Sequence, residues 1–172
     1  MKVTDEILEN VEESKDYIDL VDKLVKPHIE SLDTLMLEID KEITKPDYEM
    51  NINTIQSYYG KLSSRLYFMV DKLKYFEIYS SNAKANEQEA FNNAYLDEIT
   101  SSDKKPAVAE LNIKSESKSK KQSLANIVYA SALKTVKAKI DAGITMVDTL
   151  KNILRAKTNL EYSSSLTKKG AF

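Results

Sequence analysis

The feature that most constrains this chain is an unbroken heptad repeat of inward-facing positions between Leu133 and Leu154. The members recur at alternating spacings of three and four residues: Leu133, Val136, Ile140, Gly143, Val147, Leu150 and Leu154. Such spacing places every member on one narrow stripe of a long helix, and the stripe is stable only when it packs against another helix. We therefore interpret these residues as a helix–helix seam and as the candidate oligomer interface.

Two earlier segments of the chain have the same period. The first begins at Ile7 and continues through His28, Leu32, Leu35 and Ile39, and the second runs from Ile55 through Leu62, Leu66, Met69 and Phe76 to Ala83. Only three Gly and three Pro occur in 172 residues, fewer than the turns of a sheet-rich domain require. The sequence predicts an all-α fold in which three long heptad-patterned segments form a coiled-coil-like helical bundle, and we expect this protomer to be oligomeric.

Composition divides the chain into three regions. Residues 1–46 are predicted to form an acidic helical arm that is kinked at Pro27, because proline removes a backbone donor and clashes with the preceding turn. Residues 47–162 are predicted to form the helical core, with a polar and basic linker at 100–123. Residues 163–172 are predicted to be a flexible tail.

The linker is expected to separate the second and third long helices. It begins with the polar run from Thr100 to Pro106 and ends with the Ser- and Lys-rich run from Lys114 to Ser123. We interpret the second run as an exposed loop or a fraying helix start. The last helix is then expected to begin near Ser123 and to end near Glu161.

The net charge of −2 conceals a strong charge asymmetry along the chain. Residues 1–50 hold 6 basic against 15 acidic side chains, whereas residues 100–172 hold 14 against 6, which gives net charges of −9 and +8. Such ends suggest contacts between copies, pairing within one chain, or a basic arm for a polyanion. Ordinary solvated helix surfaces explain the same charges equally well.

Candidate catalytic and metal-binding groups are scarce. His28 is the only histidine and occupies a seam position, which favours a core or interface role over that of a base. The neighbouring acids Glu12, Glu13, Asp19 and Asp22 are better explained as a solvated helix face than as a metal site. The three glycines are isolated, so no phosphate-binding loop is present. The sequence therefore predicts no enzyme, no cofactor and no metal site.

Cysteine usage and hydropathy bear on location. The chain has no cysteine, which fits a reducing cytoplasm and excludes disulfides and thiolate metal sites. No apolar run approaches the roughly 18 residues that a membrane-spanning helix needs. We expect a cytoplasmic protein with neither a signal peptide nor a membrane partner.

The basic region supplies the candidate nucleic-acid surface. Lysines can neutralise phosphates and release counterions without demanding exact geometry. Aromatic rings can stack on unpaired bases, and the chain has ten Tyr and four Phe, although most lie in the apolar second helix and are more simply core. Solvated-linker lysines remain the alternative, and a membrane-surface role is weaker because the lysines are spread around the helix. The predicted nucleic-acid-binding residues are Lys114, Lys118, Lys120, Lys121, Lys134, Lys137 and Lys139.

The features in the last two-thirds of the chain follow an order that is also found in a known protein family. A long Tyr- and Lys-containing helix is followed by a polar interruption and a Lys-rich segment that leads into the final helix. That last part reads Lys118-Ser-Lys-Lys-Gln-Ser-Leu124, then Lys134-Thr-Val-Lys-Ala-Lys-Ile140, then Val147-Asp-Thr-Leu-Lys-Asn-Ile-Leu-Arg-Ala-Lys157. From about Asn51 to Tyr162 this arrangement resembles phage recombination mediator proteins of the UvsY type.

The resemblance implies a function. Its members are small cytosolic helical proteins without catalytic residues, so the location would be the host cytoplasm if the chain is phage-encoded. It implies a cyclic homo-oligomer that binds single-stranded DNA and loads a recombinase onto strands covered by a single-strand-binding protein. The family closes its first long helix with a basic pair and a Tyr-Tyr-Ser-Gly turn, whereas residues 92–98 here read Asn-Asn-Ala-Tyr-Leu-Asp-Glu. No DNA-binding residue is therefore carried over from that corner.

Two functional hypotheses follow from the sequence. The first is a non-enzymatic, single-stranded-DNA-binding recombination mediator. The second is a helical structural or interaction protein, such as a virion or complex component or an inhibitor of a host protein, that binds no nucleic acid. DNA affinity and its salt dependence distinguish the two.

Overall fold

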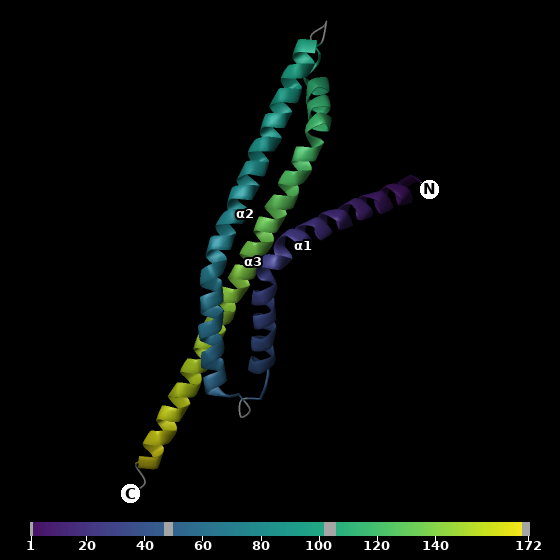
Figure 1. The fold of residues 1–172 in the computed structure, drawn as a ribbon. Coiled ribbons are helices and arrows are strands. Elements are labelled where there is room, and N and C mark those ends of the chain that lie inside the picture. The colour runs from purple at the N-terminus through teal and green to yellow at the C-terminus, as the bar shows by residue number, and fades with distance from the viewer. Residues whose placement is uncertain (1, 47–49, 102–105, 170–172) are drawn as a thin grey trace. The chain divides into compact units, whose positions relative to one another are not determined.

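The chain folds into three long helices (Figure 1). The computed structural model describes residues 2–46, 50–101 and 106–169, and it describes side chains for 15–46, 50–101 and 106–159. Helix α1 spans Lys2–Ile43, α2 spans Ile52–Ser101 and α3 spans Val108–Lys169. The described residues contain no strand, so the predicted all-α class is confirmed.

The three helices are shared between two compact units. Unit 1 comprises Met1–Lys26 and Leu73–Val136, and unit 2 comprises Pro27–Lys72 and Lys137–Phe172. The boundary in α1 falls at Pro27, where the missing amide hydrogen removes one bond from the helical ladder. Helix α1 stays helical across this proline.

Unit 2 is a bundle of one segment from each helix. Asn51 caps the start of α2, and its Oδ1 accepts hydrogen bonds from the amides of Asn53 (2.9 Å) and Thr54 (3.4 Å). Lys72 Nζ donates to the carbonyl oxygen of His28 across two of the segments. Apolar side chains from all three segments are buried: Leu32, Leu35, Ile39, Ile55, Leu62, Leu66, Met69, Ile140 and Leu150. The predicted heptad positions of α2 therefore do face a core.

Unit 1 pairs the second half of α2 with the first half of α3. The two segments run side by side in Figure 1, where they are coloured teal and green. Their buried positions are filled mainly by small side chains: Ala83, Ala94, Ser115, Ser119 and Ala132, together with Phe76 and Leu111. The first part of α1 belongs to the same unit and lines a cavity with α3, where Tyr17 and Val21 lie opposite Val128 and Thr135.

The predicted basic linker is largely helical. Helix α3 begins at Val108 rather than near Ser123, and Ser115 and Ser119 within the predicted linker are buried. Ser115 Oγ donates to the carbonyl oxygen of Leu111 at 2.8 Å, so a small polar side chain is buried with its hydroxyl satisfied by its own helix. The expectation of an exposed loop or a fraying helix start from Lys114 to Ser123 is therefore wrong.

The far end of α3 also differs from expectation. The helix continues to Lys169 rather than ending near Glu161, so its backbone enters the segment predicted as a flexible tail. Residues 170–172 of that tail lie outside the described part of the chain. Helix α2 ends at Ser101 and α3 begins at Val108, and residues 102–105 of the predicted break between them lie outside the described part of the chain.

The predicted seam position of His28 is wrong. His28 is exposed, and its neighbour Ile29 is buried instead. Buried positions run from Val25 to Ile29 to Leu32, so a step of four precedes a step of three. Either order completes one heptad, and burying an isoleucine costs less than burying an imidazole.

The hydropathy of the helices agrees with the lack of long apolar runs in the sequence. Among the residues that the structure describes, no helix contains a stretch long and apolar enough to cross a membrane.

Candidate nucleic-acid interface

The seven predicted lysines all lie on α3 but fall in both units. Lys114, Lys118, Lys120, Lys121 and Lys134 belong to unit 1, whereas Lys137 and Lys139 belong to unit 2. The members in unit 1 are exposed, as is Lys137, and Lys139 lies at the border of exposure. The structure therefore brings together at most the first five in one compact unit.

Two of these five are held by a carboxylate of α2. Lys118 Nζ lies 2.6 Å from Glu98 Oε1, and Lys114 Nζ lies 3.5 Å from Glu98 Oε2 and 3.0 Å from Glu110 Oε1. The hydrogen bond from Lys118 and the charges of Lys118 and Lys114 hold the pKa of Glu98 below its usual value, although desolvation acts in the opposite direction. The hydrogen bond to Glu110 and the charges of both acids raise the pKa of Lys114. These lysines already have anionic partners within the protein.

The two lysines of unit 2 are also engaged. Lys139 Nζ lies 2.8 Å from Asp33 Oδ1, which ties α3 to α1 in this unit. Lys137 likewise interacts with another group of the protein. Binding a phosphate at either residue would require it to give up part of an existing interaction.

Lys120, Lys121 and Lys134 differ from the other four. All three are exposed, and within the described part of the chain no carboxylate forms an ion pair with them. Lys120 and Lys134 are 14 residues apart, close to four helical turns, so they point to similar sides of α3. Lys121 points about 100° away from Lys120. These three residues are the part of the predicted set that is available to phosphates.

A cavity between α2 and α3 lies one turn beyond Lys121. Lys121 and Ala125 are four residues apart and so are neighbours on one face of α3. The cavity has a volume of about 230 Å³ and contains two tyrosine rings, Tyr79 and Tyr129, whose centroids are 5.8 Å apart and inclined by 35°. Its lining residues are Tyr79, Asn82, Ala83, Asn86, Gln122, Ala125 and Tyr129.

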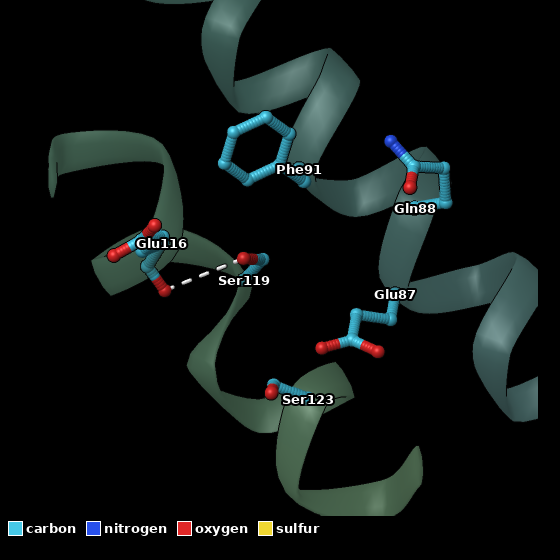
Figure 2. A pocket seen from close by; sticks show the side chains of 6 residues that line it. All are labelled: Glu87, Gln88, Phe91, Glu116, Ser119 and Ser123. Atoms are coloured by element: carbon cyan, nitrogen blue, oxygen red, sulfur yellow. Dashed lines mark hydrogen bonds between the residues drawn. The ribbon is translucent and has the colours of Figure 1, made fainter. Parts of the chain in front are cut away.

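A second cavity between the same two segments is acidic. Figure 2 shows Glu87, Gln88 and Phe91 of α2 facing Glu116, Ser119 and Ser123 of α3. Asn126 Nδ2 donates to Glu87 Oε2 at 2.6 Å, and Ser119 Oγ lies 3.3 Å from the carbonyl oxygen of Glu116. Two carboxylates repel a phosphate, so this cavity of about 320 Å³ is unsuited to a nucleic-acid backbone. Nor does the described part of the chain hold a cluster of three or more metal-ligating side chains.

The tyrosines of the first cavity were not among the predicted site residues. Tyr79 lies in the second helix, which the sequence predicts to be apolar over more than one face, so its aromatic residues are attributed there to the core. Tyr79 is in fact about half exposed, and Tyr129 is partly buried beside it. Whether a residue at one turn of α2 is buried depends on the helix that packs against that turn. The heptad pattern of α2 alone does not identify this partner helix.

The seam on α3 is used within the chain. Val136, Ile140, Gly143 and Leu150 are buried, and Leu133, Val147 and Leu154 are half-buried. The chain's own helices cover these positions, and Leu66 of α2 packs directly against Gly143. A role for the seam in assembly remains a prediction.

Comparisons of the chain with protein-family models, with curated proteins and with solved structures find no match.

Proposed function

We propose that this protein binds single-stranded DNA and is not an enzyme. The observation that supports this proposal most directly is a set of exposed lysines on the unit 1 part of α3 that pair with no carboxylate of the described residues, Lys120, Lys121 and Lys134. Each can neutralise a phosphate and release a counterion, which is the main source of sequence-independent affinity. Tyr79 and Tyr129 beside this stretch add rings that can stack on unpaired bases.

The biological role that we propose is recombination mediation. The order of helices, polar break and Lys-rich segment resembles UvsY-type mediators over about residues 51–162. In this role a homo-oligomer of the chain would hold single-stranded DNA while a recombinase replaces the single-strand-binding protein. The recombinase and the single-strand-binding protein would then be its partners.

The DNA-binding proposal is tested by fluorescence anisotropy of a labelled oligothymidylate of about 30 nucleotides, titrated at several salt concentrations. If three lysines neutralise phosphates, the slope of log affinity against log salt should be close to −2, since each contact on a single strand contributes about −0.7. Absence of binding at about 50 mM salt would overturn the proposal. A duplex of the same length serves as the comparison and should bind more weakly.

The mediator role has its own test. The full-length protein should accelerate assembly of a recombinase on DNA that is saturated with single-strand-binding protein, measured as recombinase ATP hydrolysis. DNA binding without any such acceleration would leave a DNA-binding protein that is not a mediator.

Exposed apolar side chains of unit 2 favour a second candidate, a helical structural or interaction protein. Tyr67 and Phe68 of α2 are 74% and 63% exposed, and Val70 is also exposed. Contiguous exposed apolar groups often mark a protein-binding surface. Multi-angle light scattering separates the candidates: a stable assembly that ignores oligonucleotides at low salt would favour this second function.

A further inference from the structure

We propose that the cavity between α2 and α3 in unit 1 receives one unpaired nucleobase. This inference rests on the proposed single-stranded-DNA binding and assigns the residues that contact the base. The binding groups are the rings of Tyr79 and Tyr129 and the amides of Gln122, Asn82 and Asn86. At about 230 Å³ the cavity is smaller than the roughly 300–1,000 Å³ of sites for drug-sized ligands, so it suits a single flat ring system.

Gln122 is the strongest indication of a ligand. Its Oε1 atom is buried and accepts no hydrogen bond from the described residues. A buried amide oxygen without a partner is destabilising, so native proteins seldom retain one without a reason. Every nucleobase carries an N–H group on its pairing edge, and Gln122 can accept from any of them once its amide turns toward the cavity. This contact would tolerate all four bases.

The two tyrosines offer a stacking surface. Their centroids are 5.8 Å apart and the rings are inclined by 35°, so the pair is not closed into a parallel stack. About half of Tyr79 is open to solvent. A base that enters the cavity can therefore stack on Tyr79 while its pairing edge faces the amide groups.

Charge distinguishes this cavity from its acidic neighbour. None of the described residues that line it carries a carboxylate, whereas Glu87 and Glu116 line the other cavity between the same segments. Glu87 follows Asn86 in α2, and successive helix residues point about 100° apart, so the acid and the amide face different sides. Lys121, one turn before Ala125, is placed to neutralise the phosphate of the bound nucleotide.

The experiment compares two oligonucleotides of equal length and charge, oligothymidylate and an abasic chain of tetrahydrofuran phosphodiesters. We expect the full-length protein to bind oligothymidylate at least tenfold more tightly. Equal affinity for both would overturn the base site but leave the DNA-binding proposal standing. Failure to bind either at low salt would overturn both.

Variants locate the base within the molecule. Tyr79→Ala should weaken oligothymidylate binding about five- to 150-fold, the range observed for loss of one base–aromatic stack, and should leave abasic binding unchanged. Tyr75→Ala is the matched control, because Tyr75 is equally exposed, lies one turn earlier on α2 and does not line the cavity. Equal losses for the two variants would contradict the assignment.

Gln122→Met tests the hydrogen bond separately from folding. Methionine keeps the length of the side chain and removes the unpartnered oxygen, so we expect an unchanged or higher melting temperature. The preference for oligothymidylate over the abasic chain should fall at least fivefold. A variant that melts normally and keeps the full preference would exclude Gln122 from base recognition.

Discussion

Gly143 of α3 and Leu66 of α2 are in unusually close contact within unit 2. A Cβ atom built on Gly143 would lie 2.7 Å from Leu66 Cδ2, well inside the roughly 3.5–4.0 Å at which carbon atoms pack best. Alanine in a helix interior gains about 1 kcal/mol over glycine, but overpacking costs typically 1–3 kcal/mol. We expect Gly143→Ala to lower the free energy of unfolding by about 1 kcal/mol in urea denaturation.

Gly60→Ala is the control for this prediction. Gly60 lies in the interior of α2, and no heavy atom would come within 4 Å of its Cβ. The helix propensity gain is then unopposed, and stability should rise by about 1 kcal/mol. If Gly143→Ala and Gly60→Ala both changed the free energy of unfolding in the same direction, the contact with Leu66 would not determine the effect of Gly143→Ala.

Part of this contact follows from the heptad pattern, because the seam is a local property of the sequence. Gly143 occupies an inward position between Ile140 and Val147, and a residue without a side chain there allows two helices to approach closely. The sequence did not define which helix approaches it. That assignment depends on contacts between distant parts of the chain.

The start of α3 could not be predicted for a different physical reason. Lys114 to Ser123 looks like a loop because Ser and Lys are common in solvated linkers. In the structure Ser115 and Ser119 face the core of unit 1, and Lys118 between them is exposed. Burial of two serines against α2 is a tertiary effect that overrides the local preference. The same effect hid the cavity of Tyr79 and Gln122, because its lining comes from two helices.

Acid should weaken unit 1 through Glu98. Because folding lowers the pKa of Glu98, the ionised side chain stabilises the folded state at pH values above the pKa of the unfolded chain. This contribution is lost as the pH falls through the pKa of the folded state. The wild type should therefore melt higher than Glu98→Gln at pH 7, and the difference should shrink as the pH falls below the pKa of the unfolded chain, in thermal melts followed by circular dichroism.

The matched control for this pH dependence is Glu89→Gln. Glu89 is exposed on the same helix and forms no ion pair in the described part of the chain. Its variant should follow the wild-type melting curve at every pH. A Glu98→Gln difference that persists unchanged below pH 3 would show that the ion pairs with Lys118 and Lys114 are not its origin.

Leu150 tests whether the seam of α3 is buried in solution. Its side chain is fully buried, so Leu150→Lys places a charge in the core of unit 2 and should cost more than about 3 kcal/mol of stability. Ile144→Lys is the control, because Ile144 lies on the same helix and is about half exposed. Denaturation curves of the two variants should differ by at least 2 kcal/mol. If Leu150→Lys keeps the native midpoint, the seam is open to solvent.

Some of the predicted lysines form ion pairs with described carboxylates and others form none with them. This difference predicts how each lysine affects the salt dependence of DNA affinity. Lys121→Ala should reduce the slope of log affinity for oligothymidylate against log salt by about 0.7, because one phosphate contact is lost. Lys118 is already bound to Glu98 at 2.6 Å, so Lys118→Ala should change the slope much less and lower the melting temperature instead. The measurement is the anisotropy titration at several salt concentrations, with a melt of each variant. If Lys118→Ala reduces the slope as much as Lys121→Ala, the ion pair with Glu98 does not keep Lys118 from the phosphates.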